Sequence, residues 1–428
     1  MKLTPFCLFL TLALPLTANE ALDLLEGKDE SAGWTVAPVA SGGGGSGEQV
    51  EGGPGPARDW DYDRRSMRYL PPLFSVYQND DNEFVQRVSF DGLLEWRTED
   101  GSYEPDNAPK SDLDDTGVRR ARLGARVRAF YNTDFEARAV FDDDDYQGID
   151  SLRATVDVAD GVAVSVGKYR PPFSGEYSLD PAVRVTPEIG QLSRQIAPAN
   201  TLGAMVAVQA GGWDYAAGYF SGDVDKDIPD LDGDGFILGK VAYTFQGPPL
   251  SPDNAESPGS DTYQRWYLDY IYNLNRDDSS SIPLAYQHLA STGVEVSSER
   301  MDLLVDLMLA NGDVNTAWGL TVLGSYWLYE DAVQIVGRYH YADTDDDNGL
   351  IVGYGIGSAI GDSTQPQTYP TTFTADELHS FYFGLNFYFF ENYIILNTGI
   401  EYQLLKDDDD SALDADSWIW QAGGRIAF

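Results

Sequence analysis

The chain has 428 residues and a formal net charge of −41, with 69 acidic residues against 28 basic ones. This balance argues against binding to a nucleic-acid backbone. Aromatic residues make up 13% of the chain, and its single cysteine, Cys7, excludes both a disulfide framework and a thiolate metal site. With its many Gly and Tyr residues, this is the composition of an exported β protein.

Residues 1–18 are predicted to form a signal peptide. Lys2 supplies the basic start, and residues 3–16 form an apolar segment too short to span a bilayer. Residues 19–80 are predicted to form a flexible linker, because Ser41–Gly47 and Gly52–Pro56 are too rich in Gly, Ser and Pro to sustain a helix or a strand. No later apolar run is long enough to predict a transmembrane helix.

Residues 81–428 alternate between apolar and polar side chains in segments that suit tilted membrane strands of ~9–11 residues. We therefore predict an all-β fold, a sixteen-stranded antiparallel transmembrane β-barrel. The predicted strands lie near Phe84–Arg97, Val118–Tyr131, Asp134–Phe141, Ile149–Val158, Val162–Tyr169, Leu202–Ala210, Trp213–Ser221, Phe236–Phe245, Tyr263–Leu274, Ser281–Ala290, Arg300–Ala310, Ala317–Tyr329, Ala332–Ala342, Leu378–Phe389, Tyr393–Leu405 and Ser417–Phe428.

The links between these strands alternate in kind. Even-numbered links are tight turns such as Asp160-Gly161 and Gly211-Gly212, whereas odd-numbered links carry acidic runs such as Asp112–Asp115. Short turns on one side and long polar loops on the other are typical of outer-membrane barrels. Two even-numbered links, Gln246–Thr262 and Ser291–Glu299, break the pattern because they are long.

The second predicted strand carries four arginines on one face, Arg120, Arg122, Arg126 and Arg128. Four charges of this kind cannot face lipid, where each would cost ~2–4 kcal/mol near the midplane, so they are predicted to face the barrel lumen. The next strands and the end of the fifth continue this basic wall, which we interpret as a path for anions. The alternative is that acids pair with these residues only to keep the lumen ordered. The predicted lumen residues are Arg120, Arg122, Arg126, Arg128, Arg138, Arg153 and Lys168.

The fifth link, Arg170–Asn200, is long and has no acidic run. Its apolar residues favour packing inside the barrel over exposure to water. We predict that it folds inward and narrows the pore, with Arg170, Arg184 and Arg194 as its basic residues. An ordinary surface loop is the alternative.

Asp230, Asp232 and Asp234 match the opening of a calcium-binding loop, D-x-D-x-D-G. The closing glutamate is absent, since Val241 takes its place, and no helices flank the loop. Structural calcium and a plain acidic loop are both open readings, and no other cofactor is predicted. The three histidines lie in no metal-ligand spacing, and no nucleophile motif accompanies them, so no enzyme is predicted.

The last strand, Ser417–Phe428, has Trp418, Trp420 and Ile426 on one face and Gln421 and Arg425 on the other. It resembles the closing strand of bacterial outer-membrane barrels, in which a terminal Phe is usual. A strand of a soluble β-sandwich is the alternative for this segment alone.

The sequence also resembles the phosphate-selective porins of types O and P. The resemblance rests on Arg119–Gly124, Phe135–Phe141, Val166–Ser174 and Arg194–Val206. It implies a homotrimer of sixteen-stranded channels in the outer membrane of a Gram-negative-type bacterium. It also implies lumen roles for Arg120, Arg122, Arg126 and Lys168. The scarcity of lysine departs from the lysine-rich lumens of the family's phosphate specialists.

These features together predict a porin, a passive diffusion channel for small hydrophilic solutes with a mild, phosphate-like anion preference. Its expected partners are the lipid bilayer of the outer membrane and small anions or other hydrophilic solutes. The alternative is a structural or surface-adhesion barrel that binds envelope polymers or divalent cations.

Overall fold

The computed structural model describes residues 74–428 except 106–110, 143–144, 224, 226, 232–234, 247–262, 275–285, 299, 313–315, 330–331, 346–349, 353–372, 390–392 and 407–413. All of them belong to one of the two compact units of the chain, Pro54–Phe428. The predicted signal peptide, and the predicted linker up to residue 73, lie outside the described residues. Among the described residues, no helix has the length and hydrophobicity of a membrane span.

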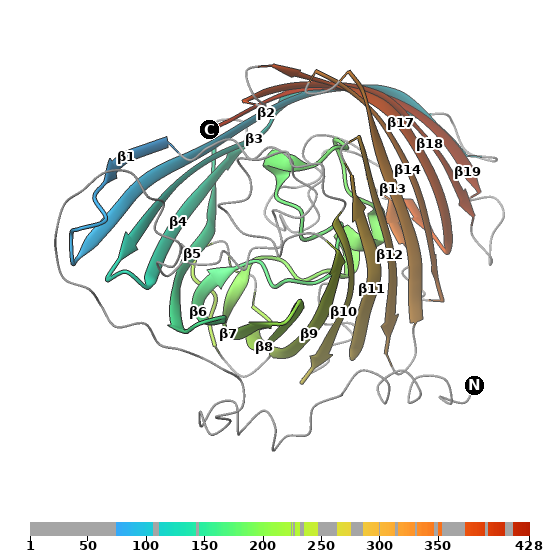
Figure 1. Cartoon of the computed structure of the whole chain (residues 1–428). Coiled ribbons are helices and arrows are strands. Elements are labelled where there is room, and N and C mark those ends of the chain that lie inside the picture. Colours follow the sequence, from blue (N-terminus) through green and yellow to red (C-terminus); the bar gives the residue numbers. More distant parts are fainter. Residues whose placement is uncertain are drawn as a thin grey trace. The chain divides into compact units, whose positions relative to one another are not determined.

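Sixteen antiparallel strands close into a barrel, as predicted (Figure 1). Each strand pairs with the next along the chain, and β19 pairs with β2 to complete the ring, for example through Gln421 and Glu99. The barrel strands are β2 (Val85–Pro105), β3 (Ser111–Ala129), β4 (Thr133–Asp142), β5 (Asp145–Ala159), β6 (Val162–Tyr169), β7 (Thr201–Ala210), β8 (Trp213–Ser221), β9 (Gly235–Gln246), β10 (Tyr263–Asn273), β11 (His288–Ser297), β12 (Met301–Asn311), β13 (Thr316–Tyr329), β14 (Val333–Thr344), β17 (Glu377–Phe389), β18 (Ile394–Lys406) and β19 (Ala415–Ala427).

The alternation of each strand sorts its side chains between the lumen and the outer surface. In β19, Trp418 and Trp420 are 55% and 44% exposed, whereas Ser417 and Gln421 are buried inside the barrel. Exposed Trp, Tyr, Phe and Leu side chains recur on other strands, as in Phe383 on β17. An apolar outer surface of this kind matches the hydrocarbon of a bilayer.

The structure corrects two predicted boundaries near the start of the barrel. Phe74–Gln78, assigned to the linker, forms strand β1, which pairs with β2. The pairing of β2 with β19 ends at Leu93, and β1 covers the free edge that remains. The acidic run Asp112–Asp115 belongs to β3 and is not a loop, because β2 and β3 pair as far as Tyr103 and Ser111.

The tenth strand was predicted too early in the chain. It was expected at Ser281–Ala290, but β11 spans His288–Ser297, so the supposedly long link at Ser291–Glu299 is mostly strand. The link that remains, residues 298–300, is as short as the other even-numbered turns. Small and polar residues on both faces concealed the alternation here. The other long even-numbered link, Gln246–Thr262, lies outside the described residues except for Gln246, which ends β9.

The turn between β7 and β8 shows why the even-numbered links are short. Gly211 and Gly212 have φ angles of +57° and +85°. Two consecutive positive φ angles are the requirement of a type I′ hairpin turn, which glycine meets without steric cost. This turn chemistry was readable from the sequence.

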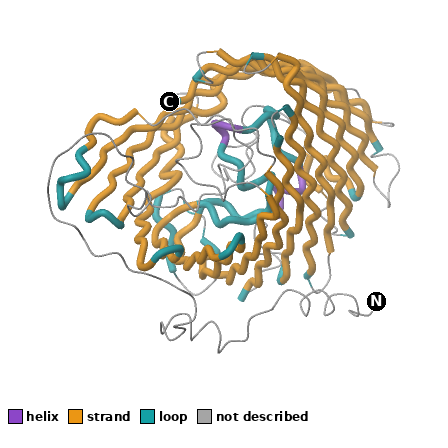
Figure 2. Tube along the Cα trace, in the orientation of Figure 1, coloured by secondary structure: helices purple, strands orange, loops and turns teal. Residues whose placement is uncertain are grey.

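Residues 170–200, between β6 and β7, fold into the lumen as predicted; we call them the inward loop. Figure 2 shows this loop and its helices inside the ring of strands. It contains a short 3-10 helix, η2 (Pro181–Val183), and the helix α3 (Gln191–Ile196). Outside the barrel sheet, β15 (Leu350–Val352) pairs with β16 (Phe373–Ala375).

Apolar packing explains why the loop turns inward. Phe173, Leu192 and Ile196 of the loop are fully buried against a cluster of inward-facing side chains from β7, β8, β9, β11 and β12. That cluster includes Met205, Phe220, Phe236, Leu238, Leu289 and Met308. Burial of each large apolar side chain contributes roughly 1.5–3 kcal/mol, so the loop is held along this wall.

Candidate functional site

A tight turn at the start of the inward loop is anchored to buried acids of β10 and β12. The Ser174 Oγ donates to Asp306 at 2.6 Å, and the Gly175 amide donates to the same carboxylate at 2.9 Å. The Ser174 amide donates to Asp269 at 3.0 Å, which also pairs with Lys240 at 2.7 Å. Ser174 has a φ of +65°, an unfavourable conformation for a residue with a side chain. These hydrogen bonds hold it there.

The opposite side of the loop faces the arginine wall of β2–β5. Asp180 accepts two hydrogen bonds from the guanidinium of Arg122, both of 2.7 Å, and lies 3.7 Å from Arg138. Burial acts to raise the pKa of the Asp180 carboxyl, but the charges of Arg122 and Arg138 outweigh it and hold that pKa well below its usual value. Asp180 therefore remains ionised and tethers the loop to β3.

Three of the predicted wall arginines share a second acid. Glu136 of β4 lies 3.1 Å from Arg126, 3.3 Å from Arg153 and 3.5 Å from Arg138. Arg138 also pairs with Asp91 of β2 at 2.9 Å. The wall arginines are therefore held in a network of shared carboxylates.

A β-bulge brings a further arginine into the lumen. Glu95 pairs in register with Arg120 and Trp96 with Val118, so Arg119 is the extra residue of β3. Arg119 and Arg120 therefore both reach Glu95, at 3.4 Å and 3.2 Å. The sequence pattern placed Arg119 outside the lumen face, because strict alternation assigns neighbouring residues to opposite faces.

Arg184 of the loop lies near several other arginines. Its side chain donates to the backbone oxygen of Leu179 at 3.1 Å. Burial lowers the pKa of the Arg184 guanidinium well below its usual value, and the charges of Arg170, Arg120 and Arg119 lower it further. Such mutual repulsion among guanidinium groups favours an anion beside them.

The third predicted loop arginine, Arg194, lies in α3 and pairs with Glu188. Arg119 of β3 meets the same carboxylate at 2.6 Å. Burial, and then the charges of Arg119 and Arg97, lower the pKa of Arg194 to about 9. Arg194 therefore belongs to the same basic surroundings as the wall arginines.

Two predicted lumen residues lie away from this cluster. Arg128 sits by the β3–β4 turn and pairs with Asp134 at 3.1 Å. Lys168 donates to the backbone oxygen of Asp225 at 2.6 Å, in the link between β8 and β9. Both residues hold links between strands in place.

The calcium prediction remains a prediction. Of its three residues, Asp232 and Asp234 lie outside the described residues, and the amide of Asp230 donates to Asp223 at 2.7 Å. Within the described residues no group of three acidic, histidine or cysteine side chains is placed to hold a metal ion.

Further arginines reach the loop from strands outside the predicted basic wall. Arg338 of β14 pairs with Glu401 at 3.0 Å and contacts the backbone oxygen of Glu188. Arg425 of β19 donates to the backbone oxygen of Arg184 at 2.8 Å. Their lumen-facing positions were readable from alternation, but their contacts with the loop were not.

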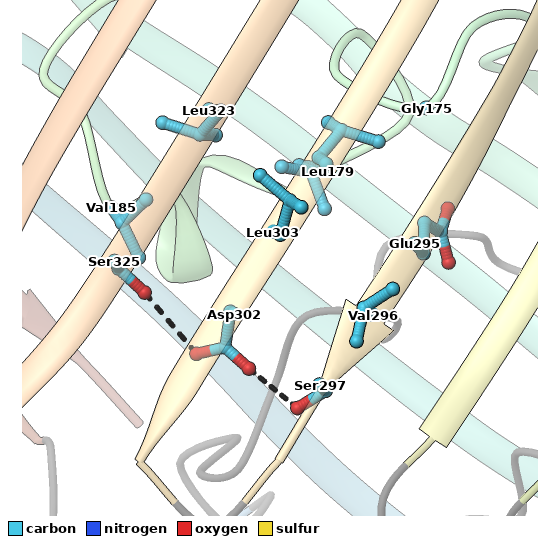
Figure 3. A pocket seen from close by; sticks show the side chains of 11 residues that line it. Gly175, Leu179, Val185, Glu295, Val296, Ser297, Asp302, Leu303, Leu323 and Ser325 are labelled. Carbon is cyan, nitrogen blue, oxygen red and sulfur yellow. Dashed lines mark hydrogen bonds between the residues drawn. The ribbon is translucent and has the colours of Figure 1, made fainter.

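A small cavity lies between the inward loop and β11–β13 (Figure 3). Leu179 and Val185 of the loop face Leu323 across it, and Ser325 donates to Asp302 at 3.2 Å at its edge. Its volume is about 30 Å³. That is room for a water or two and not for a solute.

The placement of Arg119 is open to a direct test. We expect a cysteine at Arg119 to react with a polar, membrane-impermeant thiol reagent, and a cysteine at Leu123, which is 59% exposed on the outer surface, to react with a lipophilic one. Mass spectrometry of the labelled protein in liposomes reports both reactions. A residue 119 cysteine that reacts only with the lipophilic reagent would contradict the bulge.

Comparison with known proteins bears on the segment that holds most of this site. The family model for phosphate-selective porin O and P matches residues 94–234. This confirms the resemblance over β3–β8 and the inward loop. The closed barrel with its apolar outer surface, together with this porin match, places the protein in the outer membrane. No curated protein sequence matches the chain.

Several solved structures are similar to this one. An anion-selective porin from Comamonas acidovorans is 14% identical, with a TM-score of 0.50, over 80% of this chain and 100% of that one. OprB from Pseudomonas putida is 10% identical (TM-score 0.49; 79% and 94% covered), and the channel DcaP from Acinetobacter baumannii is 11% identical (TM-score 0.47; 82% and 99% covered). At 14% identity, the similarity to the porin from Comamonas acidovorans concerns the fold alone.

Proposed function

We propose that the protein is a porin, a passive channel for small hydrophilic solutes with a mild preference for anions, and not an enzyme. The observation that carries this proposal is the asymmetry of the inward loop. One side of the loop is apolar and packs on β7–β13, and the other side is polar and meets the arginines of β2–β5. The family match over residues 94–234 supports a porin channel.

The passage in this proposal runs past the inward loop and along the arginine wall. Solutes lose part of their hydration where the loop narrows the barrel, and fixed charges there decide which sign of ion crosses at lower cost. Arginine suits the role, since its planar guanidinium binds carboxylate or phosphate with two hydrogen bonds and stays charged at any working pH.

The position of the charges outweighs their number in this mechanism. Acidic residues such as Asp225 and Asp230, in the link between β8 and β9, are exposed to water, where their field decays over ~8 Å at physiological ionic strength. The arginines Arg119, Arg120 and Arg184 lie in partly buried surroundings, in which screening is weaker. The channel should therefore prefer anions mildly despite the net charge of −41.

We also propose a homotrimer, which the family resemblance implies, and small phosphate-like anions among the solutes. Guanidinium groups take the place of the lysines that the family's phosphate specialists use. Cross-linking in native membranes tests the trimer, and chloride-current block by phosphate tests the anion class.

The purified full chain in a planar bilayer tests the channel itself. We expect steady single-channel current steps and a reversal potential across a KCl gradient of the sign given by chloride permeation. A structural or adhesion barrel plugged by its loop would show no steps. Clear cation selectivity at high salt would refute the anion preference.

A further inference from the structure

One carboxylate of the inward loop occupies the centre of a group of guanidinium groups. Glu188 pairs with Arg119 of β3 at 2.6 Å, and also with Arg97 of β2 and Arg194 of α3. Arg338 of β14 reaches its backbone oxygen. The three pairing arginines come from two wall strands and the loop itself, so the fold brings them together around a single acid.

This arrangement has the chemistry of a carboxylate-binding site. Guanidinium groups bind carboxylates through charge-assisted hydrogen bonds, and here three of them converge on one carboxylate. The site is also reachable. The Glu188, Arg119 and Arg194 side chains are 13%, 13% and 14% exposed, and the Arg97 side chain is 5% exposed. Access is therefore from the side of Glu188, Arg119 and Arg194.

We propose that Arg97, Arg119 and Arg194 bind the carboxylate group of a passing solute, and that Glu188 is a built-in occupant that the solute displaces. This inference rests on the proposed channel function and names a solute class for it. The loop carboxylate holds the three arginines in place when no solute is present.

Charge balance supports an exchange of one carboxylate for another. When Glu188 swings away, Arg97 keeps Glu99 at 3.1 Å, and Arg119 shares Glu95 with Arg120. The site then lacks one negative charge, which a monocarboxylate restores. A tetrahedral dianion brings more charge and a different shape than the group it would replace.

The loop does not have to leave the lumen for this exchange. Asp180 on Arg122, and the Ser174–Gly175 turn on Asp306, hold it on both sides. The Asn386 side chain also donates to the backbone oxygen of Val185 at 2.8 Å. Only the Glu188 side chain needs to move, so exchange is compatible with passage of a solute.

The substitution Glu188→Gln tests the inference by removing the built-in competitor. Acetate is titrated against methanesulfonate, a tetrahedral anion of equal charge, at constant ionic strength while the chloride current of single channels is recorded. The half-blocking concentration of acetate should fall about tenfold in this variant, and that of methanesulfonate should change much less. Glu188→Asp keeps the charge, so its half-blocking concentration of acetate should lie between those of the unmodified protein and Glu188→Gln.

Two further variants distinguish the displacement of Glu188 from the effect of removing a charge elsewhere in the protein. Glu377→Gln removes an equal charge from an acid that pairs with Lys406 at 2.7 Å, and it should leave acetate block unchanged. Arg194→Gln keeps Glu188 but weakens the site, so it should raise the half-blocking concentration. Acetate block unaltered by both Glu188→Gln and Arg194→Gln would overturn the inference and leave Glu188 as a loop tether. The reversal potential in KCl would still decide the anion preference independently.

Discussion

Deleting Val183–Leu192 is expected to raise single-channel conductance by about threefold or more while the barrel still assembles. The deletion removes Glu188 with its three arginine contacts and the fully buried Leu192. A sixteen-stranded barrel without such a loop is wide enough for an aqueous channel. The strands that close the barrel do not depend on this segment, because β19 pairs with β2 directly.

Single-channel recording in a planar bilayer measures the change, and heat-modified mobility on gels confirms assembly. Deletion of residues 356–365, ten residues from another long link, is the control for shortening the chain. An unchanged conductance in an assembled Val183–Leu192 deletion would show that the loop does not limit the current.

The double substitution Arg120→Gln and Arg184→Gln is expected to move the reversal potential toward cations by several millivolts. These two residues belong to the cation-rich region where Arg119 and Arg120 share Glu95. Removing two positive charges from a narrow, weakly screened passage lowers the electrostatic free energy of a cation there. The effect is larger than that of removing the same charges from a site in water.

The matched control is Arg87→Gln with Arg128→Gln. These arginines are cross-strand neighbours of β2 and β3 near a turn, and Arg128 pairs with Asp134. The control removes the same charge outside the cluster and should shift the potential much less. Equal shifts from both double variants would mean that selectivity follows total charge and not the cluster.

The alternation of side chains allowed much of this protein to be predicted from its sequence. Period-two patterning identified all sixteen barrel strands in order, with one placed too early, and sorted β19 into lipid-facing Trp418 and lumen-facing Gln421. The patterning is informative because one face of each membrane strand contacts hydrocarbon and must be apolar. The apolar residues of the inward loop likewise predicted its burial.

Other features depend on contacts between distant residues. The bulge that turns Arg119 inward arises from pairing with β2, and no local pattern marks it. Strand β1 pairs with the part of β2 that extends beyond its pairing with β19.

The barrel, the sidedness of its strands and the basic character of its first strands can be predicted from the sequence, since each follows from local periodicity and composition. Which acid meets which arginine depends instead on how the chain folds. Glu188 lies 69 residues from Arg119 in the chain and Asp180 lies 58 residues from Arg122. Such pairs form when barrel closure and the inward turn of the loop bring remote segments together, and electrostatic energy at a few ångströms then depends on that geometry.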